Sequence, residues 1–125
     1  MVGGRETILV VEDDALVREH IVSQLRLLGY EVLAAASGQE ALDVLRNTTG
    51  IDLLFTDIIM PGGLNGKQLA DRVTALYPTM KILFTSGYTE NAIVHHGRLD
   101  PGVKFLSKPY RREQLAEKVR QVLDA

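Results

Sequence analysis

The chain has 125 residues and a mass of 13.8 kDa, enough for one compact domain but too little for two ordinary ones. Hydrophobic residues make up 46% and charged residues 24%, and no cysteine is present, which excludes disulfides, thiolate nucleophiles and cysteine-ligated metals. The net charge of −2 and the longest apolar run, five residues at 32–36, argue against a nucleic-acid binder and a membrane span. We expect one cytoplasmic domain over residues 1–125, structured from about 6 to 124.

Short apolar runs alternate with helical periodicities from the N-terminus onward. Residues 8–11 form a run of branched side chains typical of a strand buried on both faces. The apolar spacing over 17–28 then predicts a helix that Gly29 ends in the left-handed conformation. The pair repeats as a strand at 31–35 and a helix at 37–45, for which Ser37 and Glu40 predict a capping box.

The remainder of the chain continues this alternation with three more strands and three more helices. The strands are predicted at 53–56, 81–85 and 104–106. The helices are predicted at 69–76, 91–98 and 115–122, the second of them short because it contains poor helix formers. Five strands alternating with five helices predict an α/β fold, with a parallel sheet covered by helices on both faces. Such sheets bind ligands beyond the carboxyl ends of their strands.

Polar residues collect where these strands end. They are Glu12-Asp13-Asp14, Asp57, Thr85-Ser86 and Ser107-Lys108-Pro109. Asp14 is explained by the N-cap of the following helix, but Asp57 closes an apolar run and would be repelled by the other acids unless a cation intervened. Oxygen-only ligands from separate loops suit a hard divalent ion, Mg²⁺ first and Mn²⁺ as a second candidate.

The charges of this predicted site favour phosphoryl chemistry. Three carboxylates (−3), one Mg²⁺ (+2) and Lys108 (+1) sum to about zero. Replacing the −1 of Asp57 by roughly −2 for a phosphoryl group would leave about −1, with new oxygens that require donors. The site is therefore suited to sense phosphorylation of Asp57.

Four motifs together resemble the receiver domain of two-component response regulators over about residues 6–124. They are ILVVEDD at 8–14, LLFTDIIMP at 53–61, ILFTSGY at 82–88 and FLSKP at 105–109. The resemblance implies a flavodoxin-like doubly wound five-stranded parallel sheet with strand order 2-1-3-4-5. It also implies a phosphorylatable switch rather than a turnover enzyme, apart from self-catalysed phosphotransfer and slow autodephosphorylation.

The resemblance assigns roles residue by residue. Asp57 is similar to the phosphoacceptor and Lys108 to the family's lysine, with a cis peptide expected before Pro109. The implied metal ligands are Glu12, Asp13, Asp57 and the backbone carbonyl of Ile59. The switch hydroxyl is Ser86 or its neighbour Thr85; Ser86 is preferred because it stands 22 residues before Lys108. Phe105 corresponds to the aromatic residue whose rotamer follows activation.

The implied partners are a histidine kinase or a histidine phosphotransfer domain and an unidentified output partner, with the chain a monomer or weak dimer. The strand-four end resembles receivers of hybrid sensor kinases. The sequence departs from the common pattern in a loop at 61–66 that is one residue longer and in Ser86-Gly87, where Thr-Ala is frequent. That glycine makes the coupling loop more flexible.

Other interpretations of the same residues remain. A magnesium-dependent phosphatase with an aspartate nucleophile would need a second acid two positions after Asp57, where Ile59 stands. A dinucleotide or flavin domain would need glycines or hydroxyls after the first strand rather than acids. A scaffold-only receiver is disfavoured because no expected pocket residue is missing. His95-His96 and Arg111-Arg112 are interpreted as surface or partner-contact residues.

Overall fold

The computed structural model describes residues 3–60, 63–86 and 104–125, which contain five strands and four helices. The strands are β1 (Thr7–Val11), β2 (Glu31–Ala35), β3 (Leu53–Asp57), β4 (Lys81–Ser86) and β5 (Phe105–Ser107). The helices are α1 (Ala15–Leu27), α2 (Gly38–Asn47), α3 (Gly66–Leu76) and α5 (Arg112–Leu123). The helix predicted at 91–98, with its two histidines, lies outside the described residues. Within the described part of the chain, no helix is both long and apolar enough to span a membrane.

All five strands pair in parallel in the order β2-β1-β3-β4-β5, which confirms the predicted flavodoxin-like topology. Because β1 and β3 are neighbours at the centre, Val11 lies level with Thr56 and the residues that follow both strands meet at one edge. The pairing of β3 with β4 places Asp57 level with Thr85. The pairing of β4 with β5 places Ser86 level with Ser107. The topology thus brings Asp57, Thr85 and Ser86 to the same edge of the sheet as the residues that follow β1, whereas Phe105 lies at the opposite end of the short strand β5.

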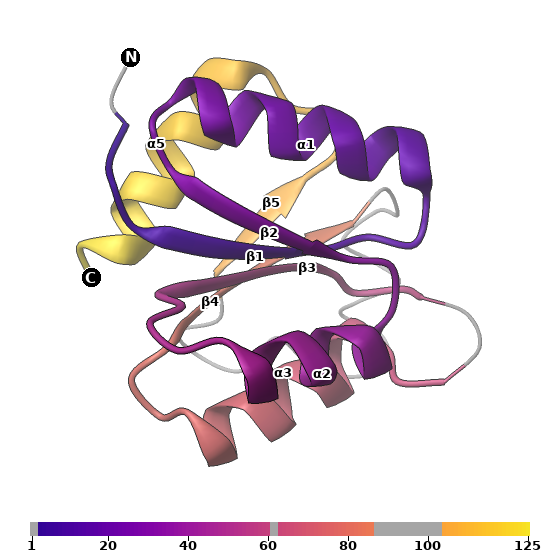
Figure 1. The fold of residues 1–125 in the computed structure, drawn as a ribbon. Coiled ribbons are helices and arrows are strands. Elements are labelled where there is room, and N and C mark those ends of the chain that lie inside the picture. The colour runs from indigo at the N-terminus through magenta and orange to yellow at the C-terminus, as the bar shows by residue number, and fades with distance from the viewer. Residues whose placement is uncertain (1–2, 61–62, 87–103) are drawn as a thin grey trace.

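Two apolar layers hold the helices on opposite faces of the sheet (Figure 1). Ile8, Phe55 and Leu83 face α1 and α5, whereas Leu9 and Leu54 face α2 and α3. Side chains alternate between faces along a strand, so uninterrupted apolar runs are what a sheet covered on both sides requires. The first layer continues through Leu25 of α1 and Leu115 and Val119 of α5, all fully buried.

Helix ends follow the sequence signals in part. The Asp14 side chain caps α1 by accepting from the Val17 N–H, and Gly29 has φ +99° just after that helix, as predicted. Ser37 caps α2 by accepting from the Glu40 N–H. Helix α3 begins at Gly66, three residues before the first apolar position used to predict it, because Asn65 and Gln68 form a reciprocal capping box.

Four strands also have bounds that differ from the predicted ones, beginning with β1, which starts one residue earlier, at Thr7. Strands β3 and β4 each extend one residue further, to Asp57 and Ser86, and β5 is displaced by one residue to 105–107. The prediction ends β3 and β4 at Thr56 and Thr85, but backbone pairing continues through the next polar residue of each strand because its neighbour is in register. Asp57, Thr85 and Ser86 are therefore held by the sheet itself rather than by loops.

Candidate functional site

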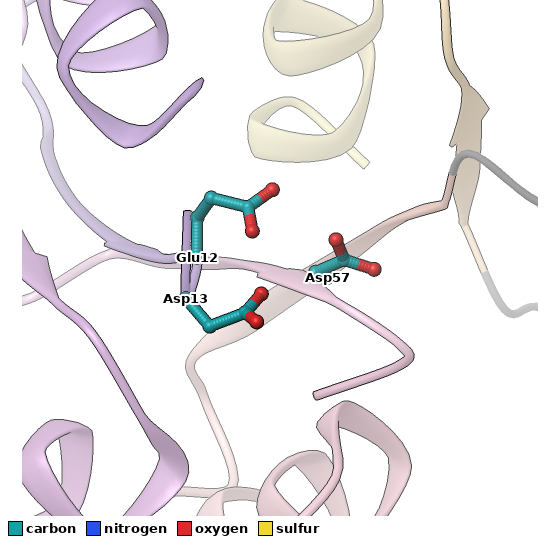
Figure 2. Close-up of side chains that lie close together, drawn as sticks. All are labelled: Glu12, Asp13 and Asp57. Atoms are coloured by element: carbon teal, nitrogen blue, oxygen red, sulfur yellow. The ribbon is translucent and has the colours of Figure 1, made fainter. Parts of the chain in front are cut away.

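Three carboxylates from two central strands meet at the carboxyl edge of the sheet. Glu12 and Asp13 follow β1 directly, and Asp57 is the last residue of β3. Carboxylate oxygens of the three residues lie within 4.8 Å of one another. Glu12 and Asp13 leave the backbone in opposite directions, and both carboxylates turn toward the side of Asp57 (Figure 2). The sheet order therefore joins residues that are 44 and 45 positions apart in the sequence.

The three acids differ in exposure. Glu12 is 2% and Asp57 8% exposed, whereas Asp13 is exposed to solvent. Backbone N–H groups hold the buried pair in place: Asp14 donates to Glu12 Oε2 at 3.1 Å, and Ile59 donates to Asp57 Oδ1 at 3.2 Å. Buried carboxylates require such partners because each loses its hydration on folding.

Lys108 neutralises part of this charge. Its ammonium donates to Glu12 Oε1 at 2.6 Å and to Asp57 Oδ2 at 2.9 Å. The backbone N–H of Lys108 in turn donates to the Ser86 carbonyl at 2.9 Å, which fixes the start of this side chain against β4. The peptide bond between Lys108 and Pro109 is cis, as predicted.

The titration behaviour follows from these contacts. Burial lowers the pKa of Lys108, but its hydrogen bonds to Glu12 and Asp57 outweigh burial, so that the pKa is raised above its ordinary value. The hydrogen bond with Glu12, and then burial, raises the pKa of Asp13. At neutral pH the site thus contains a fully charged lysine and an acid whose ionisation is opposed by its neighbours.

The two candidate hydroxyls lie side by side on β4 but in different environments. Thr85 is level with Asp57, and its carbonyl accepts from the Ile58 N–H at 3.0 Å. Ser86, the last residue of the strand, is fully buried and lies one position nearer the carboxyl edge. Phe105 begins β5, is partly buried and is level with Phe84.

Two residues that the sequence analysis overlooked shape the site. Gly66 donates its N–H to the Ile58 carbonyl at 2.8 Å, and a Cβ atom there would lie 2.0 Å from the Asp57 carbonyl oxygen. Only glycine allows α3 to begin so close to Asp57. Tyr110 packs on Phe55 with ring centroids 6.5 Å apart. Burial, followed by the charges of Glu12 and Asp57, raises the pKa of Tyr110.

The donor set fits a hard divalent cation. Glu12, Asp13 and Asp57 offer only oxygen atoms, and the three are close enough to ligate one ion. With Lys108 included, three negative charges face one positive charge, a net −2 that one Mg²⁺ would balance. Ile59, the fourth predicted ligand, is positioned by its N–H bond to Asp57, and the residue is 42% exposed.

A doubly wound parallel sheet with an acidic triad and a lysine at its carboxyl edge defines a class of signalling domain. The chain matches the response regulator receiver domain over residues 8–120 and belongs to that family. Receiver domains are phosphoacceptor switches of two-component signalling. They take the phosphoryl group from histidine kinases or phosphotransfer proteins and bind Mg²⁺ at an acidic pocket.

Relatives with this domain include both long and short proteins. The chain is 37% identical over 122 residues to the sensor kinase CckA of Brucella abortus. The match covers 97% of this chain but only 13% of that protein. It is 34% identical to the response regulator receiver protein CpdR of Brucella abortus, covering 94% of the chain and 97% of that protein. The crystal structure of the receiver domain from the hybrid histidine kinase CckA is 41% identical, with a TM-score of 0.76 and coverage of 94% and 98%.

Proposed function

We propose that Asp57 is the phosphoacceptor of this receiver domain and takes its phosphoryl group from the phosphohistidine of a histidine kinase or histidine phosphotransfer domain. The observation that carries this proposal is the position of Asp57: 8% exposed, at the end of a central strand, between a lysine and two further acids. A carboxylate held on one side by the Ile59 N–H and on the other by Lys108 is oriented before its partner arrives.

In the transfer, an Asp57 oxygen attacks phosphorus, a P–O bond forms, and the P–N bond to the partner's imidazole breaks. The imidazole nitrogen keeps the electron pair and takes a proton from solvent. Lys108 starts within 2.9 Å of Asp57 Oδ2 and is therefore placed to donate to the oxygens of the incoming group. Its second bond, to Glu12 Oε1, keeps the ammonium at the site when the bond to Asp57 is lost.

We further propose that Glu12, Asp13, Asp57 and the Ile59 carbonyl hold Mg²⁺, with Mn²⁺ able to replace it. When bound, the ion would neutralise negative charge on the carboxylates and on the transferred group. The chain's own residues supply the orientation: Asp14 fixes Glu12 through its N–H, and the start of α3 at Gly66 fixes the backbone after Asp57. A phosphatase that turns over is disfavoured because Ile59 provides no acid two positions after Asp57.

The experiment that tests this function compares two acid-to-amide variants. Asp57→Asn should abolish phosphorylation by acetyl phosphate in Mg²⁺, because an amide is not a nucleophile under these conditions. Asp14→Asn is the matched control, since Asp14 caps α1 and lies outside the triad. Intact-mass spectrometry should show a gain of one phosphoryl group in the control only. Full labelling of Asp57→Asn would refute the assignment.

We propose that Ser86 and Phe105 carry the signal away from Asp57. Ser86 ends β4 and is level with Ser107 on β5, the strand that begins with Phe105. A hydroxyl drawn toward a phosphoryl oxygen would shift the end of β4 and alter the space next to β5. Ser86→Ala should leave Asp57 reactive but reduce the change of backbone amide chemical shifts on β5 when beryllofluoride, a phosphoryl mimic, is added. Equal changes in both proteins would redirect the role to Thr85.

A further inference from the structure

The hydroxyl of Thr85, like that of Tyr30, is buried without a hydrogen-bond partner among the described residues. Thr85 is 2% exposed, and within the described residues its Oγ1 is buried with no hydrogen-bond partner. Thr56, a fully buried threonine on the neighbouring strand, instead donates to the Asp57 carbonyl at 2.9 Å. Buried hydroxyls are nearly always paired because an unpaired one destabilises the fold. Two adjacent strands therefore carry threonines with opposite hydrogen-bond status.

The position of Thr85 links the two sides of the site. Its Cα is the register partner of Asp57, and its carbonyl is bonded to the next residue, Ile58. The following residue, Ser86, accepts the backbone N–H of Lys108. A displacement of this segment, caused by a new group on Asp57, would therefore move the Thr85 hydroxyl relative to its surroundings.

Tyr110 lies on the same face of the sheet as Thr85. Alternation from Leu83 places Thr85 on the face covered by α1 and α5, and Leu106, its register partner on β5, packs into that layer. Tyr110 packs against the same core cluster, and among the described residues no hydrogen bond reaches its hydroxyl. Phe105, one position before Leu106, alternates to the opposite face.

We propose that Thr85 is a positioning residue for phosphotransfer whose hydroxyl is unpaired in the unmodified domain and bonds to the Tyr110 hydroxyl when Asp57 is phosphorylated. This inference rests on the proposed function of Asp57. It places a second coupling path on the α1 and α5 face, separate from the path through Ser86 and Phe105. The unpaired hydroxyl destabilises the unmodified state, and pairing it favours the phosphorylated one, so the two effects act in the same direction.

The test is a double-mutant cycle with Thr85→Val and Tyr110→Phe, both of which remove a hydroxyl and keep the shape. Beryllofluoride in Mg²⁺ serves as the probe, and its affinity is measured by calorimetry. Each single variant should weaken binding roughly three- to tenfold, and the double variant should bind no more weakly than either single one.

Thr85→Val should also move the urea midpoint of the unmodified domain upward, whereas the control Thr56→Val should move it downward because its hydroxyl has a partner.

The outcomes separate this inference from the function on which it rests. Wild-type protein that takes up no beryllofluoride would overturn both. Wild-type protein that binds it, with unchanged affinity in Thr85→Val or independent, additive losses in the cycle, would overturn the Thr85–Tyr110 bond alone. A lower urea midpoint in Thr85→Val would show that the hydroxyl already has a partner in the unmodified domain, and would overturn the inference in the same way.

Discussion

The two edges of the sheet both carry clustered charges, but their acids behave in opposite ways. At the amino edge, Arg120 of α5 donates to Glu6, just before β1, and to Asp124. The hydrogen bond to Arg120 lowers the pKa of Glu6 to about 2, and that of Asp124 is lowered for the same reason. At the carboxyl edge, the hydrogen bond with Glu12, and then burial, raises the pKa of Asp13.

The difference follows from the balance of charge and from burial. Two acids and one arginine at the amino edge give a net −1, and the Glu6 and Asp124 side chains remain 30% and 62% exposed. Three acids and one lysine at the carboxyl edge give a net −2, with Glu12 and Asp57 nearly buried. Ionised Glu6 and Asp124 therefore stabilise the fold at the amino edge, whereas ionised Asp13 destabilises it at the carboxyl edge, and a bound cation would relieve that effect.

The largest effect is expected from removing the ammonium group that bonds to two acids of the carboxyl edge. Lys108→Met leaves Glu12 and Asp57 without their shared ammonium and removes the donor for the incoming group. The rate of phosphorylation by acetyl phosphate should fall roughly 10²-fold, while Mg²⁺ affinity should not decrease because a repelling charge is gone. Rates from phosphate release and mass spectrometry, with Lys118→Met on α5 as control, would measure this. An undiminished rate would mean that Lys108 is only structural.

A change at Asp13 should separate metal binding from stability. Asp13→Asn should weaken Mg²⁺ binding about tenfold, since one charged ligand is lost. In metal-free buffer at pH 7 the same variant should be more stable by about 0.5 kcal/mol, because a carboxyl whose pKa is raised on folding disfavours the folded state when ionised. Urea denaturation with and without Mg²⁺ checks both. A loss of stability without metal would contradict the contrast between the edges.

An effect on stability alone, smaller than the effects on phosphorylation rate and Mg²⁺ affinity, is expected at the amino edge and has the opposite sign to that of Asp13→Asn. Glu6→Gln should destabilise the domain by about 1 kcal/mol at pH 7, since Glu6 and Arg120 are only partly buried. The folded-state pKa of Glu6 is lowered, so its contribution is complete above the ordinary value of 4.5 and is lost as pH falls toward about 2. The stability difference between the two proteins should therefore vanish over that range. A difference that persists at pH 2 would exclude this ion pair as the cause.

Much of the carboxyl edge could be predicted from the sequence because its signals are local. An acid that closes an apolar run, as Asp57 does, is visible without a structure, and the parallel topology then places it beside Glu12 and Asp13. The Glu6–Arg120 pair could not be predicted in this way, because its partners are 114 residues apart and neither belongs to a recognisable motif. Surface charges of this kind pair only once the fold is known.

Two further features of the site depend on pairing rather than on residue type. Thr85 and Ser86 are adjacent residues that both carry a hydroxyl, yet the strand register places only Thr85 level with Asp57. Nothing in the sequence indicates that the Thr85 hydroxyl lacks a partner among the described residues. The early start of α3 did have a local signal, since Asn65 and Gln68 stand at capping-box spacing. Apolar periodicity alone does not include these polar residues and places the start of the helix at Leu69.

The most direct measurement locates the phosphoryl group in the wild-type chain. The domain would be treated with acetyl phosphate in Mg²⁺, reduced with borohydride, which converts an aspartyl phosphate to homoserine, and digested for peptide mass spectrometry. We expect homoserine at position 57 alone, with Asp13 and Glu12 unmodified. Modification of either of those residues in place of Asp57, or a phosphoryl group that resists hydroxylamine and is lost in acid, as from a histidine, would contradict it.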